Sequence, residues 1–202
     1  AADRIYEVLE TETGIKNAEG AEDIPEDAEG EIRFEHVSFR YPDAEENVLT
    51  DIDFTARPGE TTAIIGSTGC GKTTLINLIP RFFDVTEGRI TVAGRDIREV
   101  TLESLRDEIG YVPQKGILFS GTVADNIRWG KEDATDEEVI AAAKAAKAHH
   151  FIKTLPGGYD MMLNEDATNI SEGQRQLLTI ARAVIADKRL LILDEATSSV
   201  DT

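Results

Sequence analysis

A glycine-rich stretch that ends in a lysine and two threonines carries the strongest chemical signal in the sequence. It reads Gly66-Ser67-Thr68-Gly69-Cys70-Gly71-Lys72-Thr73-Thr74 and matches the phosphate-loop pattern G-x-x-x-x-G-K-[ST]. Phosphates need many hydrogen-bond donors at short range, and glycines let successive backbone N–H groups turn inward around them. In such a loop Lys72 reaches the β- and γ-phosphates, and the Thr73 hydroxyl binds Mg²⁺. All nine residues are therefore predicted to form the binding loop for a nucleoside triphosphate.

The segments on either side of this loop have the hydrophobic patterns of a strand and a helix. Residues 61–65 are apolar and rich in β-branched side chains, which predicts a buried strand. After the loop, Leu75, Leu78 and Ile79 share one face of a predicted helix. This strand–loop–helix order is the context that a phosphate loop requires. It argues against the alternative, an ordinary glycine-rich turn before a helix.

A second candidate piece of the site follows an apolar run near the end of the sequence. Residues 190–193 are all Leu or Ile and precede Asp194 and Glu195, which predicts a strand buried on both faces of a parallel sheet. Ligands of open α/β sheets bind at the carboxyl ends of the strands, so we expect the two motifs to converge. Asp194 would hold Mg²⁺ through water, and Glu195 would act as general base. The alternative is a buried strand that simply ends in acidic residues.

The charge balance is strongly acidic and limits the classes of partner. The 202 residues include 39 Asp or Glu and 21 Lys or Arg, a formal net charge of −18. This charge argues against nucleic acid or anionic lipid as the main partner. Ten of the acidic residues fall within residues 1–30, against Arg4 and Lys16. That stretch is predicted to be a solvated, flexible linker.

Cysteine content and hydropathy further narrow the class of protein to which this sequence can belong. Cys70 is the single cysteine, which excludes an internal disulfide and fits a reducing compartment. No apolar run approaches the roughly 20 residues that span a bilayer, and the first residues lack the pattern of a signal peptide.

Local patterns predict the elements that must position the site. Helical spacing in residues 1–10 resembles the tail of a longer helix. The predicted strands are 31–41, 48–56, 88–92 and 109–112. In the first of them, Ile32, Phe34, Val37 and Phe39 are predicted to form one buried face. The predicted helices are 102–107, a long run from 136 to about 155, and 171 to about 186.

The last of these helices begins with a distinctive segment. Residues 169–176 read Asn-Ile-Ser-Glu-Gly-Gln-Arg-Gln, and Ser171 to Gln174 match the capping box S-x-x-Q. By itself this pattern indicates only a well-capped helix. Because it ends shortly before the acidic strand, the segment closely resembles the signature motif of ATP-binding cassette (ABC) proteins. Nearly the whole chain resembles the nucleotide-binding domain of an exporter-type ABC transporter.

The resemblance implies roles for further residues. It implies that Tyr41 stacks on adenine and that Gln114 contacts Mg²⁺ and the attacking water and couples to a membrane domain. The segment Phe119 to Thr122, which follows Gln114, is similar to the segment typical of exporter domains at this place. The implied catalytic residues are Glu195 and Gln114, and the implied Mg²⁺ ligands are Thr73, Gln114 and Asp194. Tyr41 and the phosphate loop are implied to bind ATP. Ser171, Gly173 and Gln174 are implied to contact the ATP of a partner subunit, and Asp201 belongs to the implied D-loop.

The resemblance also implies a fold and an assembly. The fold is an α/β cassette of the P-loop NTPase class: a mostly parallel core sheet with flanking helices, an antiparallel β subdomain near the N-terminus and an inserted α-helical subdomain that carries the signature. The implied divisions are a membrane-domain tail and linker (1–30) and the nucleotide-binding domain (31–202), itself divided into 31–120, 121–186 and 187–202. The implied partners are a second such domain, in a homo- or heterodimer, and a transmembrane domain, at the cytoplasmic face of the membrane.

Three departures from the family pattern bear on activity. Glu172 occupies the position where the signature usually has glycine. Residues 164–169 differ from the sequence that commonly precedes the signature in exporters. The family's switch histidine lies beyond the D-loop, whereas His36, His149 and His150 all precede Glu195. We therefore expect these histidines to be surface or strand residues, and this chain to hydrolyse ATP more slowly than a version extended through the switch histidine.

Two other functions remain open on the sequence alone. One is a soluble ABC ATPase without a membrane partner, against which the exporter-like Phe119 to Thr122 argue. The other is a nucleotide-gated dimerisation module with little turnover, against which Glu195 and Gln114 argue. Measuring ATP binding and ATP hydrolysis on the same protein separates the dimerisation module, which binds ATP with little hydrolysis, from an exporter motor or a soluble ATPase.

Overall fold

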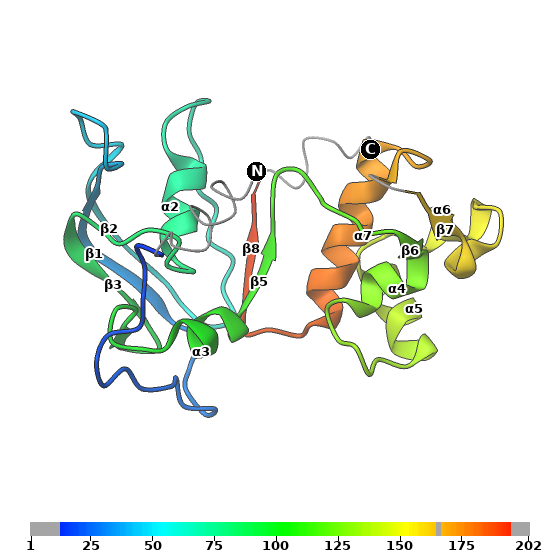
Figure 1. Ribbon diagram of the computed structural model, residues 1–202, viewed down its shortest axis with the longest axis horizontal. Helices are drawn as coiled ribbons and strands as arrows, with labels where there is room; N and C mark the ends of the chain where they lie inside the picture. Colours follow the sequence, from blue (N-terminus) through cyan, green and yellow to red (C-terminus); the bar gives the residue numbers. More distant parts are fainter. Residues whose placement is uncertain (1–12, 165–166, 195–202) are drawn as a thin grey trace, which may run out of the picture. The chain divides into compact units, whose positions relative to one another are not determined.

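The computed structural model describes residues 13–164 and 167–194 (Figure 1). The chain forms two compact units, Ala1–Arg106 and Asp107–Thr202, and each is described by itself.

The first unit is built on a four-stranded antiparallel sheet in the order β2-β1-β3-β4. Its strands are β1 (Ile32–Phe39), β2 (Leu49–Ala56), β3 (Glu87–Val92) and β4 (Arg95–Asp96). The apolar residues predicted to share one buried face of β1 are all at most 3% exposed: Ile32, Phe34, Val37 and Phe39. Across the sheet the Phe34 and Phe54 rings stack at 4.5 Å between centroids.

Two complementary bulges interrupt the pairing of β1 with β2. Between the pairs Phe34–Phe54 and Val37–Ile52, β1 has one extra residue, and His36 has a φ of 50°. One step further along, β2 has the extra residue, and Asp51 has a φ of 51°. On the other side of β1, a Cβ on Gly88 would lie 2.3 Å from the His36 carbonyl oxygen. Gly88 therefore lets β3 approach the bulged backbone closely.

Part of the acidic stretch predicted to be a flexible linker is docked against the first unit. The Glu22 N–H donates to the Glu99 carbonyl at 3.1 Å, and the Thr101 N–H donates to the Glu22 carbonyl at 3.0 Å. Ile24 is 6% exposed, and its N–H donates to Ser104 Oγ. A buried isoleucine and paired backbone groups fix this segment, so the prediction of flexibility was wrong here. The expected helix in residues 1–10 lies outside the described residues.

The phosphate-loop segment differs from the sequence prediction on its N-terminal side. The helix after the loop forms as expected (α2, Lys72–Leu78), and α3 spans Leu102–Asp107 as predicted. Residues 61–65, predicted to be a buried strand, are exposed and form no strand, and Ile65 is 92% exposed. A β-branched run becomes a strand only where a neighbour supplies ladder hydrogen bonds. No strand pairs with 61–65 in the part of the chain that the structure describes.

The second unit combines two small sheets with helices around one apolar core. β5 (Ile109–Val112) pairs in parallel with β8 (Leu190–Leu193), and β6 (Gly121–Thr122) pairs antiparallel with β7 (Met162–Leu163). The helical elements are α4 (Val123–Arg128), α5 (Asp136–Ala145), α6 (His149–Thr154), the 3₁₀ helix η1 (Gly158–Asp160) and α7 (Glu172–Ile185). Their facing side chains are nearly all apolar, among them Val123, Ile127, Val139, Ile152 and Leu178.

Two predictions for the second unit were wrong. The helical run expected from 136 to about 155 breaks at Lys147, whose φ of 61° is left-handed, and the Ala148 N–H reaches back to the Ala143 carbonyl at 2.7 Å. Ala148 is thereby fully buried. Strand β8 is not buried on both faces, since Leu191 and Leu193 are 45% and 48% exposed. Alternate residues share a face, so within the described residues one face of β8 remains uncovered.

Parallel pairing among the described strands is limited to β5 and β8. The antiparallel sheet expected near the N-terminus is present as β1 to β4. None of the described helices has the length and the apolar character needed to cross a membrane.

Candidate functional site

The phosphate loop has the backbone geometry that its glycines predict. Gly69 and Gly71 have φ values of 83° and 93°, in the left-handed region that favours glycine. At Gly66 a Cβ would lie 2.5 Å from Cys70 Sγ, so a larger residue would collide with the loop's own thiol. The chain therefore turns tightly into α2, with Gly71 at the cap position.

The start of α2 differs from the starts of three other helices. α4, α5 and α7 each begin with a capping box, formed by Thr122, Thr135 and Ser171. No side chain caps α2. The first N–H groups of a helix need acceptors, and a phosphate is a strong one.

Lys72 places its ammonium within the curve of the loop. Its Nζ donates to the carbonyl oxygens of Gly66 at 2.9 Å and Ser67 at 3.0 Å. The loop thus holds a positive charge beside its exposed backbone, as a phosphate site requires. Residues 66–70 are exposed, including the Cys70 thiol.

Tyr41 lies beside this loop, although it is 25 or more positions earlier in the sequence. Its hydroxyl is hydrogen-bonded to Thr74 Oγ1 at 3.0 Å, and Thr74 is 8% exposed. The Tyr41 ring meets Phe39 and Phe83 edge-to-face, at centroid distances of 4.9 and 5.3 Å. These contacts fix the tyrosine at the end of β1, next to the helix that follows the phosphate loop.

The second unit brings Gln114 and Asp194 to one edge of the β5–β8 pair. The two strands are parallel, with Val112 opposite Leu193, and the Asp194 N–H donates to the Val112 carbonyl at 2.9 Å. Gln114 follows β5 and Asp194 follows β8, so both stand at the carboxyl ends of their strands, which is the place that the sequence predicts for Asp194. Asp194 is 5% exposed. Burial, together with the charge of Asp194, raises the pKa of the neighbouring Tyr111 phenol.

Helix α7 supports the loop that carries Gln114 through two residues that sequence reasoning missed. Gln176 is 3% exposed, and its Nε2 donates to the Pro113 carbonyl at 3.5 Å. A Cβ on Gly116 would lie 2.5 Å from Thr179 Oγ1, so this helix and the loop are in close contact. The helical period of α7 indicates that Gln176 and Thr179 face inward, but nothing local indicates what they touch.

Ser171 caps α7 as the sequence predicts. The Gln174 N–H donates to Ser171 Oγ at 3.2 Å, and the Ser171 N–H donates to Gln174 Oε1 at 3.0 Å. Capping uses the Ser171 oxygen as an acceptor, so its O–H still has a proton to donate. Ser171 and Glu172 are both exposed.

The predicted site residues fall on different parts of the chain. Tyr41 and the phosphate loop belong to the first unit, and Gln114, Ser171, Gly173, Gln174 and Asp194 belong to the second. Glu195 and Asp201 lie outside the described residues.

An exposed aromatic patch, made of Ile117, Phe119 and Trp129, lies on the second unit. The Phe119 and Trp129 rings stack at 4.4 Å between centroids, and the three side chains are 63%, 42% and 60% exposed. The Arg182 guanidinium lies 5.4 Å from the Phe119 ring centroid and donates to the Ile117 carbonyl at 2.9 Å. Beside the patch, a groove of about 290 Å³ is lined by residues that include Tyr111, Ile117 and Trp129.

Comparisons with known proteins agree on one family. The family model described as ABC transporter matches residues 49–198. A putative multidrug export ATP-binding/permease protein of Staphylococcus aureus is 49% identical over 197 residues, which are 98% of this chain and 34% of that protein. An uncharacterized ABC transporter ATP-binding protein of Bacillus subtilis, YfiB, is 47% identical over 201 residues, which are 100% of this chain and 35% of that protein.

A solved structure gives the same result. The structure of a bacterial Atm1-family ABC exporter with ATP bound superposes with a TM-score of 0.92 at 36% identity, and the match covers 100% of this chain and 35% of that one. The chain therefore spans about a third of the length of the relatives it matches.

Proposed function

Because this chain belongs to the ABC transporter family, we propose that it is the ATP-hydrolysing motor domain of an exporter. The names of its relatives, which include multidrug export ATP-binding/permease proteins, support an exporter over a soluble ATPase. In this proposal the domain lies at the cytoplasmic face of a membrane and drives substrate export through a transmembrane domain. The parallel core sheet and the helical subdomain of the family's cassette are part of the same proposal.

The observation that carries the proposal is the conformation of the phosphate loop. Left-handed glycines, a helix start without a side-chain cap and the Lys72 ammonium together offer donors and positive charge to a triphosphate. Tyr41, held beside the loop by Thr74, would stack on the adenine ring. ATP is thus the ligand that this geometry supports best.

The remaining site residues would carry out hydrolysis. Thr73, Gln114 and Asp194 would hold Mg²⁺, which neutralises phosphate charge when bound. Gln114 would orient the attacking water, and Glu195 would accept its proton as general base. Hydroxyl, amide and carboxylate oxygens are the ligands that Mg²⁺ prefers, so the donor set fits this ion.

We expect Lys72→Ala to weaken ATP·Mg²⁺ binding by about tenfold to a hundredfold. The substitution removes a charge-assisted contact to the β- and γ-phosphates, worth about 1.5–3 kcal/mol. Calorimetric titration with ATP·Mg²⁺ measures the change. Lys144→Ala, at an exposed position of α5, is the matched control and should leave the affinity unchanged. An unchanged affinity in Lys72→Ala would show that the phosphate site is elsewhere.

A second copy or a homologous domain would complete each ATP site. In the head-to-tail dimer that we propose, Ser171, Gly173 and Gln174 of one subunit face the γ-phosphate held by the other, and Asp201 lies near the interface. The Ser171 hydroxyl can still donate its proton to a phosphate at the start of α7. The N–H groups at this helix start also favour a phosphate at that position. ATP would therefore act as a bridge between subunits.

We further propose that the transmembrane domain docks on the aromatic patch. Exposed apolar patches of this kind mark interaction sites, and aromatic side chains are enriched at the energetic centres of interfaces. The relatives include ATP-binding/permease proteins of which this chain covers about a third, so a permease part is the occupant that the comparisons favour. The Arg182 guanidinium and the stacked Phe119 and Trp129 rings support one another within the patch.

Trp129→Ala is expected to weaken retention of this domain by the transmembrane part at least tenfold, because it removes a large stacked ring from the patch. The two parts of the full-length protein would be co-expressed as separate chains, and the amount of this domain that co-purifies would be measured. Met162→Ala removes a side chain that is 62% exposed but outside the patch, and serves as the control. Equal retention of the two variants would contradict docking at the patch.

A further inference from the structure

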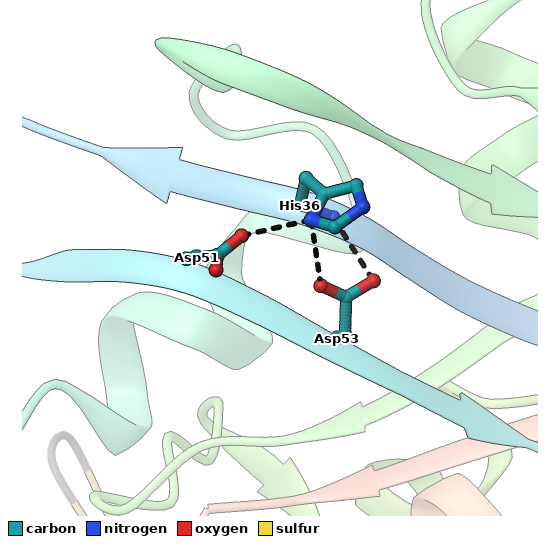
Figure 2. Close-up of side chains that lie close together, drawn as sticks. All are labelled: His36, Asp51 and Asp53. Atoms are coloured by element: carbon teal, nitrogen blue, oxygen red, sulfur yellow. Dashed lines mark hydrogen bonds and ion pairs between the residues drawn. The ribbon is translucent and has the colours of Figure 1, made fainter.

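His36, Asp51 and Asp53, none of which is assigned to ATP, form a cluster on the sheet of the first unit. Figure 2 shows the imidazole from β1 and the two carboxylates from β2 turned toward one another. The His36 Nδ1 atom lies 2.8 Å from Asp51 Oδ1 and 3.0 Å from Asp53 Oδ2. The three side chains are about half to four-fifths exposed, so solvent reaches them.

The two bulges bring these side chains together. In the register of Val37 with Ile52, His36 and Asp53 lie across from each other on neighbouring strands. Asp51 joins them because it occupies the reciprocal bulge of β2, where its N–H donates to Ser38 Oγ at 3.1 Å. The His36 N–H donates to Asp53 Oδ1 at 3.1 Å, which leaves the second oxygen of that carboxylate aimed at the imidazole.

The positions of the three ligand atoms resemble one side of a metal coordination shell. One donor atom from each residue can be chosen so that all three lie within 4.8 Å of one another. In a tetrahedral Zn²⁺ site with bonds of about 2.0–2.2 Å, neighbouring ligand atoms are about 3.3–3.6 Å apart. The two separations from His36 Nδ1, 2.8 and 3.0 Å, need to open by about half an ångström to reach this range, which exposed side chains can do at little cost.

We propose that His36, Asp51 and Asp53 bind a divalent transition metal ion of the Zn²⁺ type, with water completing the coordination. An imidazole and two carboxylates on one face supply three ligands of the kinds that Zn²⁺ accepts. The imidazole selects against Mg²⁺ and Ca²⁺, which prefer oxygen ligands. The hydrogen bond that the His36 backbone N–H donates to Asp53 orients that carboxylate as an outer hydrogen bond does in known metal sites.

The charges around the cluster also favour a cation. The hydrogen bond with Asp51, together with the charge of Asp53, raises the pKa of the His36 imidazole, so the same carboxylates that stabilise a proton there would stabilise a metal ion. Glu35, the residue before His36 in β1, adds negative charge, although it is paired with Arg89 and Arg33. A bound ion would join β1 to β2 and stabilise the folded first unit by mass action.

The test is a Zn²⁺ titration of the 202-residue chain, stripped of metal and free of nucleotide, by calorimetry near pH 7.5. We expect one ion per chain and at least a tenfold loss of affinity in His36→Asn. Asparagine tolerates the left-handed backbone of this position, so the substitution removes the imidazole with little strain. His150→Asn, at an exposed position of α6, is the control and should bind as the unsubstituted chain does.

Two further measurements decide between this cluster and other sites. Asp51→Asn also keeps a residue suited to its left-handed backbone, and should lower the Zn²⁺ affinity by a similar factor if the cluster is the site. Mg²⁺ in hundredfold excess should not displace the Zn²⁺. Unchanged binding in both asparagine variants, or loss of binding in Cys70→Ser instead, would place the ion elsewhere and overturn the proposal.

Discussion

Glu195→Gln is expected to lower ATP hydrolysis by about 10²–10⁴-fold and to leave ATP·Mg²⁺ affinity within a few-fold of its original value. Glutamine keeps the size of the side chain but cannot accept a proton from the attacking water. Glu195 lies outside the described residues, so the prediction rests on its place directly after Asp194, whose burial at the end of β8 the structure does define. Steady-state phosphate release at saturating ATP measures the rate, and calorimetric titration measures the affinity.

The control for this substitution must make the same chemical change at a position that takes no part in ATP binding or hydrolysis. Glu137→Gln does so in the first turn of α5, where the side chain is exposed and distant in sequence from every ATP motif. Its hydrolysis rate should match that of the unsubstituted chain. If Glu195→Gln hydrolyses ATP at a comparable rate, another group accepts the proton, and the assignment of the general base is wrong.

Features that depend on a few neighbouring residues could be predicted from the sequence. The Ser171 capping box, the buried alternation along β1 and the limits of α3 and β5 all follow from patterns shorter than about a dozen residues. The ATP motifs are of the same kind, because each is a contiguous stretch. The convergence of the phosphate loop with Asp194 and Glu195 was expected from the rule that ligands bind at the carboxyl ends of parallel strands, and it stays a prediction.

Features decided by distant contacts could not be predicted. Lys147 is no helix breaker, yet α5 ends at Ala145 and the left-handed Lys147 that follows places Ala148 in the core. Ile24 anchors a stretch whose composition indicates disorder. Gln176 supports the Gln114 loop through a contact 63 positions away in sequence. In each case the deciding partner lies outside any local window, so local pattern could not identify it.

Asn126 supports the backbone of the aromatic patch, a role that its residue type alone does not indicate. It is 1% exposed, and its side-chain amide binds the backbone of Phe119 twice: the Phe119 N–H donates to Oδ1 at 2.9 Å, and Nδ2 donates to the Phe119 carbonyl at 2.8 Å. Nδ2 also donates to the Thr122 carbonyl at 3.1 Å, and Arg182 Nη2 donates to Oδ1 at 3.1 Å. Burial lowers the pKa of the Arg182 guanidinium, because desolvation disfavours its charged form.

We therefore expect Asn126→Ala to reduce the free energy of unfolding of the second unit by about 3–5 kcal/mol. Each buried polar group left without a partner costs about 1–3 kcal/mol, and the substitution affects at least the two backbone groups of Phe119. Trp129 is the single tryptophan and stacks on Phe119, so its fluorescence during urea unfolding reports on this unit. Asn164→Ala, at an exposed position of the same unit, should cost less than 1 kcal/mol. If Asn126→Ala lowers the free energy of unfolding by a comparably small amount, water replaces the amide, and Arg182 alone holds the backbone of the patch through its hydrogen bond to the Ile117 carbonyl.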